Sequence, residues 1–324
     1  MIARRALLAG IGALAAAPTA AAAQSAGKRP RVGYVTSAIR TVNVDAFDQG
    51  MRELGYEIGR NVLIEYRFAD GREDRVPVLV AELLRLQLDV MLAANPHVIR
   101  AARHASPSLP LVGVDLETDP IEAGWVKTLA RPGGNLTGFF LDIPELSGKQ
   151  LQFLAEAMPR LQRVAVLWDA HVASAQLKAT QAAARALKLQ LQSLAVRRPE
   201  EFVGAFDQAR QQQAQAMVIL SSPLMFVNLQ RLGVLAVEHR LAAICVFPPF
   251  AAAGGLMGYG PNLTDLFRRA AGYVDRVLKG ASPADLPIQR PGVFALAVNL
   301  ATAKALGLTL PQSLIVRADQ VIGG

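Results

Sequence analysis

Apolar and polar positions alternate along the chain in two kinds of pattern. Short runs rich in Val, Ile and Leu predict buried strands, and longer stretches with apolar residues three and four positions apart predict helices. The first strand is predicted over 32–36, followed by a helix over 45–54 and a strand over 62–68. Strands separated by helices in this way predict βαβ units and parallel sheets.

The alternation runs through the first half of the chain and then restarts. In the first half we expect helices over 76–88, 97–105 and 120–129 and strands over 89–94 and 110–114. In the second half we expect helices over 145–158, 173–187, 199–213 and 225–239 and strands over 164–168, 189–196, 216–220, 243–247 and 256–259. The predicted fold is α/β, with two doubly wound parallel-sheet lobes and a ligand cleft between them.

The last part of the chain adds one helix over 263–278, a strand over 293–298 and a helix over 300–306. An extra helix and strand after two complete halves predict that the chain returns to the first lobe. We therefore expect lobe 1 to comprise 31–143 plus 264–295, and lobe 2 to comprise 144–263 plus 296–324.

Residues 1–23 have the pattern of a cleaved export signal. Arg4 and Arg5 precede a short apolar run, and Ala21 to Ala23 offer the small side chains that signal peptidase requires. The arginine pair also resembles a twin-arginine signal. The apolar run is shorter than a membrane-spanning helix, so we expect a periplasmic protein.

Composition narrows the function further. The chain has 324 residues, 52% of them hydrophobic, which is ample for a sizeable core. The single cysteine, Cys245, excludes a disulfide within the monomer and is expected to be a core residue. The formal charge of +8 comes from basic pairs scattered among acids, so no nucleic-acid surface is expected. The four histidines have no metal-ligand spacing, and no cofactor or catalytic motif appears, so we expect neither a metal, a cofactor nor an enzyme.

Candidate binding residues follow from the parallel sheets, because ligands bind outside the carboxyl ends of parallel strands. The residues just after the predicted strands include small hydroxyls, an amide, carboxylates and aromatic rings, a mixture that suits a small polar ligand with a flat or apolar part. Thr36 and Glu117 belong to this wider set. The predicted ligand-binding residues are Ser37, Asn95, Pro96, Asp119, Asp169, Ser222, Phe250 and Tyr259.

Several segments resemble a known family. Residues 119–124 read DPIEAG and 129–138 read LARPGGNLTG, similar to the DPVxAGxVxSLARPGGNxTG signature of the ABC-transporter substrate-binding family, which includes tryptophan- and tyrosine-type uptake proteins. Segments 253–260 (AGGLMGYG), 273–287 and 299–311 resemble further blocks of that family in the same order. Asp169-Ala170 stands where the family often has Asn-Pro, so the resemblance leaves the ligand itself open.

The resemblance implies a type I periplasmic-binding fold whose two lobes close on a ligand by bending at three crossovers. It also implies delivery of that ligand to an inner-membrane permease driven by an ATPase, with a monomer as the delivering form. Three alternatives remain: a subunit that presents a ligand to a membrane receptor, an enzyme using Asp119 and Asp169 as acid and base, and the ligand-sensing core of a transcription regulator. The regulator would require a helix-turn-helix head where this chain has a signal.

Overall fold

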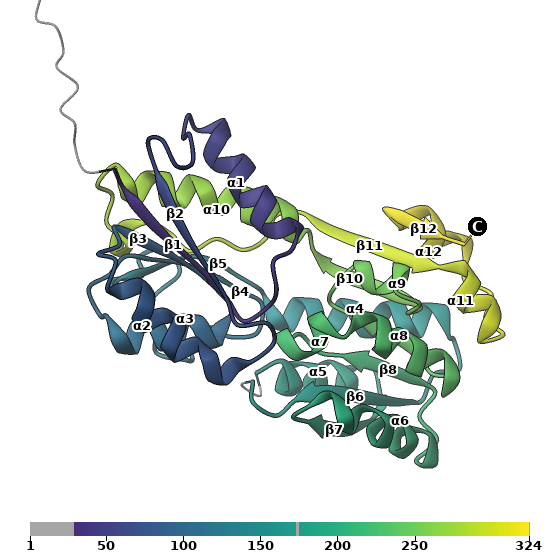
Figure 1. Cartoon of the computed structure of the whole chain (residues 1–324). Coiled ribbons are helices and arrows are strands. Elements are labelled where there is room, and N and C mark those ends of the chain that lie inside the picture. The colour runs from purple at the N-terminus through teal and green to yellow at the C-terminus, as the bar shows by residue number, and fades with distance from the viewer. Residues whose placement is uncertain (1–28, 173–174, 324) are drawn as a thin grey trace, which may run out of the picture.

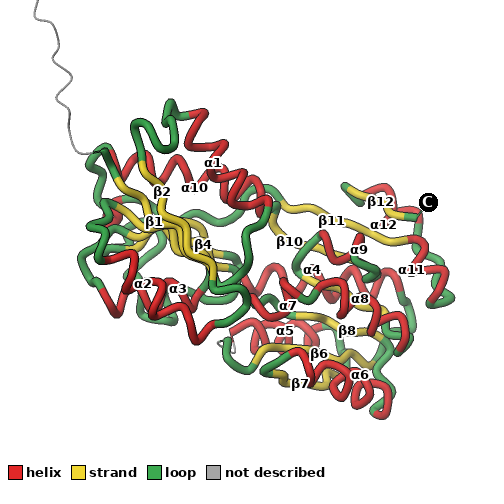
Figure 2. The backbone as a smooth tube through the Cα atoms, in the orientation of Figure 1, coloured by secondary structure: helices red, strands yellow, loops and turns green. Residues whose placement is uncertain are grey.

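The computed structural model describes residues 29–172 and 175–323, and the predicted signal over 1–23 lies outside the described residues. The chain forms two lobes, each built around its own β-sheet (Figure 1). Helices cover the faces of both sheets, and the strands lie inside (Figure 2). None of the helices within the described ranges is long and apolar enough to cross a membrane.

Lobe 1 contains a five-stranded parallel sheet in the order β2-β1-β3-β4-β5. The strands are β1 (Arg31–Thr36), β2 (Leu63–Phe68), β3 (Val90–Ala94), β4 (Leu111–Asp115) and β5 (Leu136–Phe140). Their order doubles back at β1, which places the carboxyl ends of β1 and β3 beside each other at a topological switch point. Ligands of such sheets bind at this kind of point.

Two pairs of helices cover the two faces of this sheet. Helices α1 (Val42–Glu53) and α10 (Leu263–Leu278) pack against each other on one face, and α10 also contacts β3, β4 and β5. A Cβ atom on Gly50 of α1 would lie 2.4 Å from the backbone oxygen of Arg268, so only glycine permits this close approach of the two helices. Helices α2 (Val76–Leu84) and α3 (Pro96–Ala105) cover the other face, after the short 3-10 turn Glu73–Arg75.

Lobe 2 contains a seven-stranded sheet in the order β12-β11-β10-β9-β8-β6-β7. All neighbours pair in parallel except β10 and β11. The strands are β6 (Arg163–Asp169), β7 (Gln190–Val196), β8 (Ala216–Ile219), β9 (Ala242–Cys245), β10 (Met257–Pro261), β11 (Phe294–Asn299) and β12 (Gln320–Ile322). The helices are α4 (Ile143–Ala157), α5 (Ala175–Ala186), α6 (Phe202–Gln211), α7 (Pro223–Val227), α8 (Leu229–Glu238), α9 (Pro249–Ala252), α11 (Leu300–Ala305) and α12 (Gln312–Arg317), with 3-10 turns at Pro199–Glu201 and, in lobe 1, at Pro283–Asp285.

The chain crosses between the lobes three times: after β5, between β10 and α10, and before β11 (Figure 1). The crossovers lie against one another. The backbone N–H of Phe140 donates to the carbonyl of Gln289 at 3.0 Å, and the N–H of Asn262 donates to the carbonyl of Val293 at 3.0 Å. The guanidinium of Arg290 donates to the carbonyl of Leu141, which ties the first crossover to the third. The lobes are therefore joined by a narrow bundle of backbone that can bend as a hinge.

The predicted elements agree with the structure over most of the chain. Helices α9 and α12 and strands β5 and β12 were not predicted, and the predicted helix over 225–239 is divided at Asn228 into α7 and α8. The predicted helix over 120–129 is a series of turns, because Gly124 has a φ of 67° and ends the single turn that Asp119 begins. The strand β5 was not expected, because Gly138 interrupts its apolar pattern. A Cβ on Gly138 would lie 2.0 Å from the oxygen of Gly113 in the neighbouring strand β4. The fold therefore requires glycine at the position where the sequence pattern fails.

Candidate functional site

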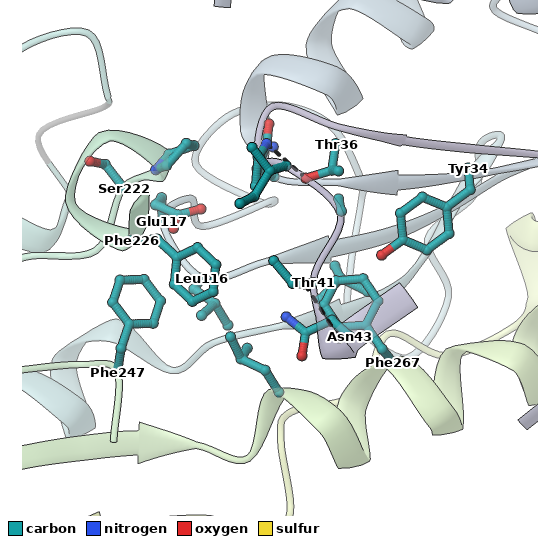
Figure 3. A pocket seen from close by; sticks show the side chains of 17 residues that line it. Tyr34, Thr36, Thr41, Asn43, Leu116, Glu117, Ser222, Phe226, Phe247 and Phe267 are labelled. Atoms are coloured by element: carbon teal, nitrogen blue, oxygen red, sulfur yellow. Dashed lines mark hydrogen bonds between the residues drawn. The ribbon is translucent and has the colours of Figure 1, made fainter. Parts of the chain in front are cut away.

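A pocket that is open to solvent lies between the lobes, and its empty space, the open solvent included, is about 570 Å³. Lobe 1 supplies the ends of β1, β3 and β4 and the start of α1 and α10, and lobe 2 supplies α7 and the end of β9. The lining residues are Tyr34, Thr36, Ala38, Ile39, Thr41, Asn43, Ala94, Asn95, Val114, Leu116, Glu117, Ser222, Pro223, Phe226, Phe247, Leu263 and Phe267 (Figure 3).

Aromatic side chains form two opposite parts of the pocket wall. In lobe 1 the rings of Tyr34 and Phe267 stack with centroids 6.1 Å apart. In lobe 2 the rings of Phe226 and Phe247 meet edge to face at 4.9 Å. Figure 3 shows these two pairs on different sides of the pocket. A flat apolar body held between the lobes would contact rings from both of them.

Several helices begin at the pocket, and their caps supply part of its polar lining. Asn95 caps α3: its Oδ1 accepts from the N–H of Val98 at 3.2 Å, and its φ of 94° turns the chain sharply from β3 into the helix. Ser222 caps α7, where its Oγ accepts from the N–H of Met225 at 3.2 Å. Thr41 caps α1 in the same way. Small polar cap residues at strand ends thus place hydroxyl and amide groups at the pocket.

The one carboxyl group that lines the pocket among the described residues belongs to Glu117. Its Oε1 accepts a hydrogen bond from the hydroxyl of Ser221, which lies across the cleft in lobe 2. Ser221 is itself held in place, because its N–H donates to Gln176 Oε1 and its carbonyl accepts from Gln176 Nε2, both at 2.9 Å. A buried side chain of lobe 1 is therefore bonded directly to a fixed residue of lobe 2.

Glu117 shares its environment with a second buried carboxyl group, that of Asp115. Asp115 Oδ1 accepts from the backbone N–H groups of Glu117 at 2.7 Å and of Thr118 at 3.1 Å. Burial raises the pKa of Asp115 to about 6, against the opposing effect of these hydrogen bonds. Burial and the adjacent Asp115 charge raise the pKa of Glu117 well above its ordinary value. Both groups are therefore easier to protonate than a free carboxyl, and burial together with the neighbouring charge makes the effect stronger at Glu117.

Among the predicted binding residues, Asn95 and Ser222 line the pocket. Ser37 and Pro96 lie directly behind it: the buried hydroxyl of Ser37 donates to Asn95 Oδ1 at 3.2 Å, and Pro96 is the first residue of α3. These four residues are brought together at the ends of β1, β3 and β8.

The other predicted residues lie away from the pocket lining. Asp119 Oδ1 accepts from the N–H groups of Ile121 and Glu122, so it caps its own turn. The ring of Phe250 is fully buried in the core, packed so closely on Gly255 that a Cβ there would lie 2.1 Å from it. Tyr259 packs between Phe153 and Phe294 in lobe 2.

Asp169 belongs to a separate polar cluster in which side chains of the two lobes face each other. Its Oδ1 lies 3.3 Å from Nδ1 of His171, and its charge acts on Glu73 and His97 of lobe 1. His97 Nε2 lies 3.1 Å from Glu73 Oε1. Burial lowers the pKa of His97 to about 4 and raises that of Glu73 to about 7, so both shifts favour the uncharged side chains. No group of three or more potential metal ligands occurs in the described part of the chain.

Sequence reasoning missed most of the apolar lining. Tyr34 lies within β1 rather than after it, and Phe226 and Phe267 lie in helices. The available signal was alternation: Tyr34 and Thr36 are two positions apart in a strand, so they point to the same side of the sheet. Glu117 was in the wider set of strand-end residues, but its burial beside Asp115 depends on tertiary packing.

Two α/β lobes with a pocket shared between them have the type I periplasmic-binding fold, and the structure of a glucose-galactose binding protein has a similar fold. Residues 34–322 match the family model described as ABC transporter substrate binding protein. The chain therefore belongs to the ABC transporter substrate-binding protein family and is a small-molecule-binding component of a transporter, not an enzyme. This family comprises extracytoplasmic binding proteins.

The individual relatives share less than a quarter of their aligned residues with this chain. The chain is 23% identical to the tyrosine-binding protein of Clostridioides difficile over 81% of its own length and 75% of the relative. Its fold matches a crystal structure from Streptococcus pneumoniae in complex with L-Trp, with a TM-score of 0.84, 21% identity, and coverage of 91% of this chain and 100% of that one. It also matches the ligand-free, open structure of a Clostridium difficile substrate-binding protein with adhesive properties, with a TM-score of 0.66, 19% identity, and coverage of 91% and 100%.

Proposed function

We propose that this protein is a periplasmic receptor that captures a small ligand between its lobes and delivers it to an inner-membrane permease driven by an ATPase. The observation that carries the proposal is the pocket itself, whose walls come from both lobes. A ligand that contacts both walls favours the closed arrangement over any open one, which is the requirement for lobe closure on binding.

The lining supports a ligand with an apolar or aromatic body and a small number of polar groups. Tyrosine and tryptophan are the ligands named for relatives, and their flat side chains suit the rings of Tyr34, Phe226, Phe247 and Phe267. The polar contacts available are the hydroxyl and amide groups of Thr36, Asn43, Asn95 and Ser222, and the carboxyl of Glu117. The predicted signal over 1–23, with its Arg4-Arg5 pair, supports export before function.

A thermal-shift screen tests the proposal. The purified protein is unfolded and refolded to remove any ligand carried through purification, and is then screened against amino acids, aromatic acids and amines, nucleobases, amides and sugars. A ligand at 100 times its Kd stabilises the folded protein by about 2.7 kcal/mol, a shift of several degrees. The absence of any stabilising compound, with no ligand released from the native protein either, would contradict the proposal.

A further inference from the structure

The charges around the pocket are unbalanced. Glu117 is its one acidic lining residue, and no Lys, Arg or His lines it among the residues that the structure describes. Arg40 is adjacent in sequence to the lining residues Ile39 and Thr41, but its guanidinium is already engaged. It lies 2.7 Å from Asp45 and 3.6 Å from Asp48, and it stacks over the ring of Tyr66. The pocket therefore offers a ligand no free cationic side chain from these segments.

Behind Glu117, Asp115 lacks a counter-charge. It is fully buried, and in the described part of the chain it forms no ion pair. Its Oδ1 is satisfied by two backbone N–H groups, and its other hydrogen-bond partners are the side chains of Glu117 and Thr118, which carry no positive charge. A buried negative charge without a counter-charge is costly unless a positive charge approaches it.

Two of the four helices that begin at the pocket, α3 and α7, offer few donors to a carboxylate. Helices α3 and α7 both begin with proline, at Pro96 and Pro223, which removes one N–H donor from each. A further N–H in each helix is taken by the cap side chain. A ligand carboxylate would meet these depleted donors together with the negative charge of the Asp115–Glu117 pair.

We propose that the pocket selects an organic cation, a molecule with an apolar or aromatic body and an ammonium group that binds the carboxyl of Glu117. This inference rests on the proposed function and specifies its ligand class. The aromatic rings add to the selection, because the faces of Tyr and Phe rings attract cations. A zwitterionic amino acid and an anionic aromatic acid bind less well than the amine with the same body.

Binding of the cation is coupled to the release of a proton. In the unliganded protein burial and the neighbouring Asp115 raise the pKa of Glu117 and favour a proton on the pair. The arriving ammonium keeps its own protons and supplies the missing positive charge, so the Glu117 carboxyl ionises and its proton passes to the buffer. The products are a carboxylate–ammonium ion pair and one free proton, and no bond to carbon changes.

A series of ligands with one aromatic body separates the classes. Tryptamine is the cation, tryptophan the zwitterion, indole-3-propionate the anion and 3-methylindole the neutral member, and the tyramine and phenethylamine series repeat the comparison. Titration calorimetry on the refolded full-length protein measures each Kd. We expect the amine in the best-fitting series to bind about tenfold or more tightly than its amino acid.

The released proton is measured by repeating the amine titration at pH 7 in phosphate and in Tris, whose ionisation enthalpies differ. We expect release of about one proton per amine bound. Glu117→Gln keeps the size of the side chain and resembles the protonated form, so we expect it to fold, to lose proton release and to bind amine about tenfold more weakly. Glu122→Gln, an exposed carboxyl on the same loop, is the matched control and should leave both quantities unchanged.

Each outcome decides between the two proposals. Tighter binding of the zwitterion, the anion or the neutral member overturns the inference, as does amine binding without proton release in the native protein. Failure of all three series overturns it too. The proposed function falls only if the wider thermal-shift screen also finds no ligand. The native-protein measurements decide the question even if Glu117→Gln fails to fold.

Discussion

Replacing Phe250 with alanine distinguishes a core residue from a ligand contact. Sequence position made Phe250 a predicted binding residue, but its ring is fully buried and lies on the backbone of Gly255. Truncating a buried Phe costs about 3–5 kcal/mol, because apolar contacts are lost and a cavity remains. At about 2–4 °C per kcal/mol, the melting temperature should fall by roughly 6–20 °C.

Phe226→Ala is the matched control, since Phe226 is half-buried and lines the pocket. We expect it to reduce the melting temperature less than Phe250→Ala and to weaken binding of the ligand found in the screen. Calorimetric unfolding and ligand titration of both variants measure the two effects. A Phe250→Ala protein that keeps its melting temperature but loses ligand affinity would refute the core assignment.

Three further predictions concern glycine positions, the cysteine and pH. Gly138→Ala should destabilise the protein by about 2 kcal/mol or more in urea unfolding, because Gly138 has a φ of 128° and the new Cβ would meet backbone. Gly148→Ala, at a helix position where a Cβ meets no other atom, should stabilise the protein by about 0.5–1 kcal/mol. Equal effects of the two substitutions would contradict the register of β5. Cys245 should resist thiol reagents at about pH 8 until the protein is unfolded, because burial raises its pKa to about 12. Rapid labelling of the native protein would show instead that the thiol is exposed to solvent. The folded pKa of Glu117 lies above its unfolded value, so its contribution to stability is complete below about pH 4.5 and is lost as pH rises through the folded pKa. The melting temperature of Glu117→Gln should therefore fall less than that of the native protein as pH rises above about 4.5.

The strands and most helices could be predicted because burial on both faces leaves a continuous apolar signal in parallel strands. The failures occur where glycine has a tertiary role. At Gly138 the strand continues through a residue that reads as a turn, because the neighbouring strand approaches too closely for a side chain. At Gly124 a left-handed residue ends a turn that reads as a helix.

The candidate site could be predicted only where a residue's position in the chain determines its place in space. Asn95 and Ser222 cap helices at strand ends, and both line the pocket, as the parallel-sheet rule predicts for such positions. Phe250 also comes after a strand, but the short helix α9 turns its ring into the core. The pairing of Glu117 with Ser221 joins two lobes, and no local pattern contains that information.

The return of α10 to lobe 1 has a consequence for biosynthesis. The sheet of lobe 1 is synthesised by Phe140, but the helix that covers one of its faces begins only at Leu263. At about 5–20 residues per second, the ribosome adds the intervening segment of about 120 residues in roughly 6–25 seconds. Throughout that time the apolar side chains of β3, β4 and β5 beneath α10 have no partner. The nascent chain thus exposes this apolar surface to chaperones until nearly all of it has been made.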